Sequence, residues 1–148
     1  MCLSYVNLFT KGTSAEQQLD DILSCINSVF TQIELAKRYE KKIVISISFG
    51  NEVSGELRSR TSIKVEKSIY ISPISDSLQY LRKFPGFVIS STNDEYLTSD
   101  DMIELGKLGN DEVLIFKDAS HSLESDSVID TIDFIKNAVI KIEEFLLK

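Results

Sequence analysis

Residues 43–50, Ile-Val-Ile-Ser-Ile-Ser-Phe-Gly, are the stretch from which the fold of this chain can be worked out. The stretch is an apolar, β-branched run that stops abruptly at Ser48, Phe49 and Gly50, and a helix-compatible segment follows at once. A short apolar run with a sharp end is typical of a buried strand in a parallel sheet. We therefore predict a central strand at 43–48 with Ser48 at its carboxyl end.

Strands and helices are expected to alternate on both sides of this strand. The predicted strands lie at 3–9, 68–73, 87–90 and 113–116, and the predicted helices lie at 14–39, 51–60, 75–83, 99–108 and from 128 to the end. Short connections between alternating strands and helices are typical of a parallel α/β sheet. The expected fold is a mostly parallel sheet of about five strands with helices on both faces, a three-layer arrangement in a single domain over residues 1–148.

The composition limits the classes of function. The chain has 148 residues, and its net charge of −7 argues against a nucleic-acid backbone or an anionic membrane as a partner. No apolar stretch is long enough to span a bilayer, and residues 1–5 lack the features of a signal peptide, so a cytoplasmic location is expected. Two cysteines and one histidine, His121, argue against a disulfide framework, a metal site or a cofactor.

Three reactive side chains follow three of the predicted strands. Ser48 ends the strand 43–48, Asp94 follows the strand 87–90, and His121 follows the strand 113–116. Because the carboxyl ends of parallel strands meet at one edge of a sheet, we expect these side chains to converge. Serine, histidine and aspartate are the residue types of a catalytic triad, in which the imidazole removes the serine proton and the carboxylate orients the imidazole.

The sequence Ser46-Ile47-Ser48-Phe49-Gly50 resembles the nucleophile elbow, G-x-S-x-G, of the α/β-hydrolases, with Ser46 in place of the first glycine. The chain order Ser, Asp, His is also similar to that of the family, and the resemblance covers roughly residues 14–148, the carboxyl-terminal portion of the family fold. It implies that Ser48 is the nucleophile, His121 the base and then the acid, and Asp94 the orienting acid. It also implies that the backbone N–H of Phe49 donates to the oxyanion, and that Ser48 has strained backbone dihedrals.

The assignment of residues leaves alternatives open. Glu95 and Asp100 are alternative acids, and Ser46 is an alternative nucleophile, although its position inside the strand should bury it. Ser120 and Ser122 flank the histidine and are expected to shape its loop.

The segment before the elbow strand lacks features of the family. Nothing in residues 1–42 resembles the loop that supplies the second oxyanion donor, and the earlier strands of the family sheet are absent. Either residues 4–9 pair directly with the strand 43–48, or a second copy of the chain covers that uncovered edge in a homodimer. Only residues 74–86 join the third and fourth strands, which leaves little room for a cap, so the site should be open.

The resemblance implies a serine hydrolase that acts on a small-molecule acyl substrate through an ester, thioester or amide bond. Its activity is expected to be weak, because loss of one oxyanion donor typically costs about 10²–10³ in rate. A non-catalytic remnant or binding module of the same fold is the alternative function. A flavodoxin-like binding domain is a more distant alternative, because residues 10–14 faintly resemble a phosphate loop.

Overall fold

The computed structural model describes residues 17–18, 20–25, 28, 41–61, 63–107 and 113–148. By internal contacts the chain divides into two compact units, Met1–Glu40 and Lys41–Lys148. In the first unit all described residues are helical, in agreement with the helix expected at 14–39. The apolar spacing of this helix predicts a core position for Cys25, but its side chain is exposed. The strand expected at 3–9 lies outside the described residues, and a single domain over the whole chain stays a prediction.

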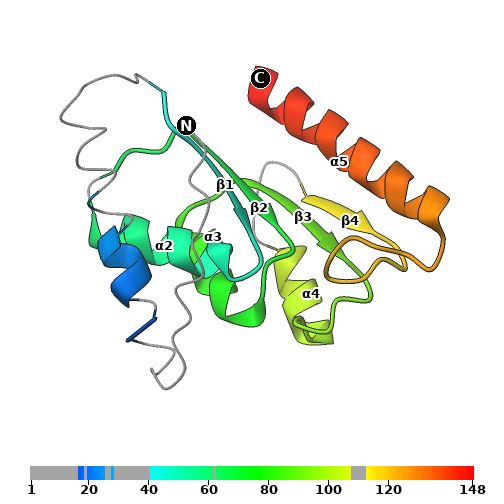
Figure 1. The fold of residues 1–148 in the computed structure, drawn as a ribbon, viewed down its shortest axis with the longest axis horizontal. Coiled ribbons are helices and arrows are strands. Elements are labelled where there is room, and N and C mark those ends of the chain that lie inside the picture. The colour runs from blue at the N-terminus through cyan, green and yellow to red at the C-terminus, as the bar shows by residue number, and fades with distance from the viewer. Residues whose placement is uncertain (1–16, 19, 26–27, 29–40, 62, 108–112) are drawn as a thin grey trace. The chain divides into compact units, whose positions relative to one another are not determined.

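The second unit contains a four-stranded, fully parallel sheet with the strand order β1-β2-β3-β4 (Figure 1). The strands are β1 (Ile43–Ile47), β2 (Lys67–Ile71), β3 (Phe87–Ser91) and β4 (Val113–Phe116). Strand β2 ends two residues earlier than expected, because Ser72 has a φ of 46° and Pro73 has no N–H to continue the ladder. Since every strand points in the same direction, the four carboxyl ends lie at one edge of the sheet.

Helices cover both faces of this sheet. The helical elements are α2 (Gly50–Arg60), η1 (Ser75–Ser77), α3 (Leu78–Lys83), α4 (Ser99–Leu105) and α5 (Val128–Leu147). No helix within the described part of the chain is both long and apolar enough to cross a membrane.

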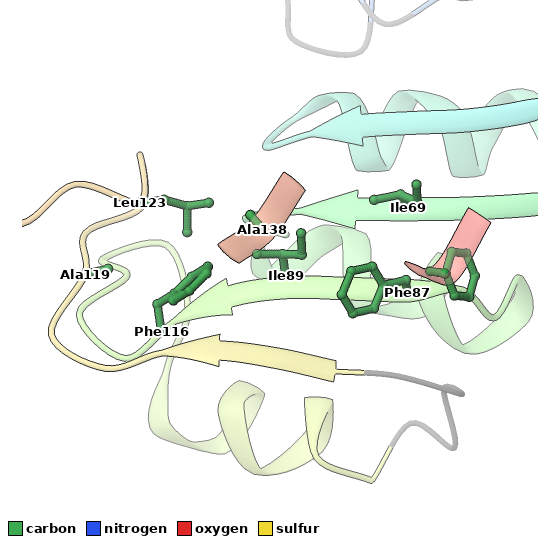
Figure 2. Packing of buried hydrophobic residues seen from close by; sticks show 8 residues of the cluster. Ile69, Phe87, Ile89, Phe116, Ala119, Leu123 and Ala138 are labelled. Atoms are coloured by element: carbon green, nitrogen blue, oxygen red, sulfur yellow. The ribbon is translucent and has the colours of Figure 1, made fainter. Parts of the chain in front are cut away.

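The two faces carry separate hydrophobic cores, as expected when successive side chains of a strand point in opposite directions. On one face Ile69, Phe87 and Ile89 pack with Phe116, Ala119 and Leu123 under α5, which contributes Ala138 and Phe145 (Figure 2). On the other face Tyr70 and Val88 pack against Leu78 and Leu81 of α3 and Leu105 of α4. This arrangement confirms the expected α/β class with three layers.

Strand β1 is an end strand of the described sheet and is the least covered. Its register pairs Ile43, Ile45 and Ile47 with Lys67, Ile69 and Ile71, which places the three isoleucines on the α5 face of the sheet. They are 48%, 54% and 59% exposed, whereas all five residues of β3 are buried. Residues 4–9, the expected partner strand, lie outside the described residues, and the homodimer stays a prediction.

Candidate active site

Ser48 lies at a sharp turn between the end of β1 and the start of α2. Its φ is 53°, the positive value that the elbow motif predicts and that a non-glycine residue adopts only at a cost in strain. Two backbone hydrogen bonds hold this turn: Ser48 N–H donates to the Ile71 carbonyl (2.9 Å), and Asn51 N–H donates to the Ser48 carbonyl (3.0 Å). The side chain of Ser48 therefore occupies a defined position at the carboxyl edge of the sheet.

A buried pair of polar side chains supports the turn from inside. Ser46 Oγ donates to Asn51 Oδ1 (2.7 Å), and Asn51 Nδ2 donates to the Ile71 carbonyl (3.0 Å), the same oxygen that accepts from Ser48 N–H. Ser46 is 7% exposed and Asn51 is fully buried. The burial of Ser46 agrees with the expectation from its place in the strand, and its hydroxyl is already used in this contact.

Asn51 is a residue that sequence reasoning missed. Its position next to Gly50 at the start of a helix was the only available signal, and that signal does not identify a partner. The partner is a carbonyl twenty positions away in the sequence, at the end of β2.

Asp94 follows β3 and turns back toward the sheet edge. Its Oδ1 accepts a hydrogen bond from Tyr96 N–H (2.9 Å), and its carbonyl accepts one from Leu97 N–H (3.3 Å). The carboxylate side chain is only 1% exposed. The alternative acids Glu95 and Asp100 are exposed, and neither has a hydrogen bond to His121.

His121 lies in the loop between β4 and α5, next to Asp94 and Ser48. Its Nδ1 is 2.8 Å from Oδ1 and 2.8 Å from Oδ2 of Asp94, and its Nε2 is 2.8 Å from Ser48 Oγ. Because a carboxylate only accepts hydrogen bonds, Nδ1 carries the proton that is shared with Asp94, and Nε2 accepts from the Ser48 hydroxyl. The structure thus brings together the three residues that the sequence singled out, from the ends of three different strands.

The histidine loop is held by its own polar contacts. Ser120 N–H donates to the Glu124 carbonyl (2.8 Å), and the Ser120 carbonyl accepts from Ser91 Oγ (2.8 Å) at the end of β3. Asp118 and Leu123 have φ values of 60° and 59°, which bend the backbone on both sides of His121. Ser120 therefore shapes the loop, as expected from its position beside the histidine.

The elbow motif implies that the backbone N–H of Phe49 donates to the oxyanion. This N–H directly follows Ser48 in the turn, and no residue in the described ranges accepts a hydrogen bond from it. Most of residues 1–42, the segment expected to lack a second oxyanion donor, lies outside those ranges. Among the described side chains, no group of three or more His, Cys, Asp or Glu residues is placed to hold a metal ion.

Glu52 lies in the first turn of α2, which begins two residues after Ser48. The pKa of Glu52 is raised above its ordinary value, mainly by burial and then by the negative charges of Asp76 and Glu56.

Neither a protein-family model nor a curated protein sequence matches this chain. Solved structures do match. An uncharacterised protein from Bacillus cereus is similar with a TM-score of 0.59 and 17% identity, over 85% of this chain and 44% of its own. The chain therefore spans less than half the length of that protein.

Two further structures carry functional descriptions. One is described as a hydrolase of the α/β superfamily, from Xanthomonas campestris pv. campestris, with a TM-score of 0.50 and 12% identity over 83% of this chain and 68% of its own. The other is esterase PE8, with a TM-score of 0.55 and 15% identity over 88% of this chain and 61% of its own. Similarity at such low identity shows the fold alone, which is a parallel α/β arrangement.

Proposed function

We propose that the protein is a serine hydrolase that cleaves ester or thioester bonds of small acyl substrates. The observation that carries the proposal is the continuous line of hydrogen bonds from Ser48 Oγ through both nitrogens of His121 to Asp94. A strand-end serine on a strained backbone, bonded to an imidazole that a buried carboxylate orients, is the arrangement that activates a hydroxyl as a nucleophile.

In the proposed reaction, Ser48 Oγ attacks the carbonyl carbon of the substrate while His121 Nε2 takes the hydroxyl proton. The C=O π electrons move to the oxygen, which becomes an oxyanion that the Phe49 N–H stabilises. The tetrahedral intermediate collapses, the bond to the alcohol or thiol breaks, and His121 returns the proton to that leaving group. Water then attacks the acyl-enzyme through the same steps and releases the acid and free Ser48.

Asp94 has two roles in the proposed reaction. The carboxylate keeps the proton of His121 on Nδ1 and stabilises the imidazolium that forms during each proton transfer. With Phe49 as the one donor assigned, we expect slow turnover, because each missing donor costs about 10²–10³ in rate.

A fluorophosphonate probe tests the proposal directly, because it phosphonylates only activated serines. We expect a single adduct, mapped by peptide mass spectrometry to Ser48, and slow hydrolysis of p-nitrophenyl acetate. Ser48→Ala should lose both signals, whereas Ser46→Ala should keep the label because Ser46 is buried and bonded to Asn51. Folded parent protein without any label at Ser48 would reject the hydrolase and favour a non-catalytic binding module of the same fold.

A further inference from the structure

Tyr96 is a large aromatic residue whose ring rests on the imidazole of His121. The two ring centroids are 4.5 Å apart, and the ring planes are tilted by 59°. The residue is nevertheless 54% exposed, so it contributes little to either hydrophobic core. An aromatic side chain that is half in solvent yet packed on the candidate base calls for an explanation other than core packing.

The backbone of Tyr96 contacts Asp94, the second member of the constellation formed by Ser48, Asp94 and His121. Its N–H donates to Asp94 Oδ1 (2.9 Å), and the same oxygen is 2.8 Å from His121 Nδ1. One residue therefore touches both Asp94, through its backbone, and His121, through its ring.

Tyr96 is itself held in place from outside the acid loop. Its carbonyl accepts a hydrogen bond from Ser75 N–H (3.2 Å), and Ser75 Oγ lies 3.0 Å from the same carbonyl. Ser75 Oγ is also bonded to Asp101 Oδ2 (2.6 Å), in the first turn of α4. The position of Tyr96 is thus set by η1 and α4, neither of which contributes a side chain to the constellation.

We propose that Tyr96 is a positioning residue for the reaction of Ser48. The inference rests on the proposed hydrolase function. Asp94 holds the imidazole through Nδ1 only, so rotation about that contact would carry Nε2 away from Ser48 Oγ. The Tyr96 ring lies against the imidazole and restricts this rotation. The Tyr96 N–H holds the Asp94 carboxylate, the group about which the imidazole would rotate.

The proposal assigns the effect to the chemical step and to the ring rather than to the hydroxyl. No described residue is bonded to the Tyr96 hydroxyl, so Tyr96→Phe should keep the contact and the rate. Tyr96→Ala should keep the backbone hydrogen bond to Asp94 but free the imidazole. Because misplacement of a catalytic group by about 1 Å can cost about 10²-fold, we expect a loss of about 10- to 100-fold in the rate of Ser48 acylation.

The first experiment measures the rate constant for fluorophosphonate labelling of Ser48 in the parent, Tyr96→Phe, Tyr96→Ala and Ile103→Ala. Ile103 is 56% exposed on α4 and lies outside the constellation, so Ile103→Ala controls for the loss of an exposed apolar side chain. With p-nitrophenyl acetate, Tyr96→Ala should lower kcat and leave KM within about two-fold, as expected when only the chemical step is affected. If the parent is labelled at Ser48 and Tyr96→Ala is labelled at the same rate, the positioning role of Tyr96 is wrong and the hydrolase proposal stands.

A second measurement does not depend on activity. His121 is the only histidine in the chain, so ¹⁵N-histidine labelling gives one set of ring signals. We expect a protected Nδ1–H signal in the parent and in Tyr96→Phe, and faster exchange of that proton in Tyr96→Ala. If the parent is not labelled at Ser48, the hydrolase proposal fails, and unchanged Nδ1–H exchange in Tyr96→Ala would separately overturn the positioning role.

Discussion

Ser46 and Asn51 are joined by a buried hydrogen bond of 2.7 Å that spans the turn containing Ser48. The first residue belongs to β1 and the second to α2, so the bond ties the strand to the helix across the strained residue. Asn51 also ties both elements to the carbonyl of Ile71 at the end of β2. The serine that replaces the first glycine of the elbow motif is therefore a specific partner for Asn51, not merely a tolerated small residue.

Asn51→Ala should destabilise the fold by about 1–3 kcal/mol. One lone pair of the Ile71 carbonyl loses its partner, and the buried Ser46 hydroxyl keeps only its longer contact of 3.5 Å with the Ile69 carbonyl. Urea unfolding of Ser46→Ala, Asn51→Ala and the double variant measures the coupling between the two side chains. The double variant should be less destabilised than the sum of the single changes. Strict additivity would mean that the two side chains act independently.

Asp94→Asn should leave the fold intact but slow the labelling of Ser48 by about 10⁴-fold, on the pattern of triads in which the acid is replaced by its amide. The amide NH₂ can donate to Nδ1, which moves the proton to Nε2, and Nε2 can then no longer accept the proton of Ser48. The ¹⁵N signals of the single histidine report this change of tautomer. Glu95→Gln is the matched control, and an equal loss of labelling there would transfer the acid role to Glu95.

Ser48→Ala and His121→Ala should each remove nearly all esterase activity, and the double variant should lose no more than either one. The reason is that the two residues act as a unit. Ser48 becomes a nucleophile only when His121 takes its proton, and without Ser48 the imidazole has no hydroxyl to activate. Turnover of p-nitrophenyl acetate under identical conditions compares the three variants. A double variant slower than both single variants by the product of their effects would argue against a shared catalytic step.

Gly86→Ala should destabilise the second unit strongly. A Cβ at Gly86 would lie 2.3 Å from the backbone carbonyl oxygen of Ser68, and two adjacent strands would have to move apart. A Cβ at Gly106 would meet nothing closer than 3.4 Å, so Gly106→Ala is the control with little or no expected cost. We expect a loss of about 1–3 kcal/mol or more for Gly86→Ala in thermal or urea unfolding. Equal stability of the two variants would contradict the close strand approach at Gly86.

Stability in acid should depend on Asp101. Its Oδ2 accepts from Ser75 Oγ (2.6 Å) and from the backbone N–H of Thr98 (2.8 Å), and these bonds, with that of Ser75 first, hold the pKa of Asp101 below its ordinary value of 3.8. Because the pKa of Asp101 is lower in the folded than in the unfolded protein, its ionised carboxylate stabilises the fold fully at pH values above the ordinary pKa of 3.8. This stabilisation is lost as the pH falls through the lowered pKa of the folded protein.

Asp101→Asn should therefore flatten the fall in stability below about pH 4. Thermal unfolding between pH 7 and pH 2.5 measures this, with Asp100→Asn as the control on the neighbouring exposed carboxyl. If the thermal unfolding midpoints of the parent and of Asp101→Asn fall in parallel through this pH range, Asp101 does not contribute to the pH dependence of stability. Since Ser75 also bonds the carbonyl of Tyr96, labelling of Ser48 in the same samples would report whether the acid loop loosens.

The sequence by itself determined the elements of the fold and the three candidate residues. Apolar β-branched runs, helical periodicity and turn residues are local signals, so they predicted β1, β2, β3 and β4 to within about two residues. Parallel order then requires that Ser48, Asp94 and His121, which follow three strand ends, share one edge. The contact between Ser48 and His121 could be expected although 73 positions separate them, because both positions follow from local strand ends.

Only the tertiary structure decided which side chains support these three. Asn51 acts through the carbonyl of Ile71, and Tyr96 acts through the imidazole of His121 and is held by Ser75. Each of these contacts joins different elements at a particular distance and angle. No local periodicity encodes such a distance, because it depends on how α2, η1 and α4 pack against the sheet. The same packing leaves Ile43, Ile45 and Ile47 exposed, although their run of β-branched residues indicated a buried strand.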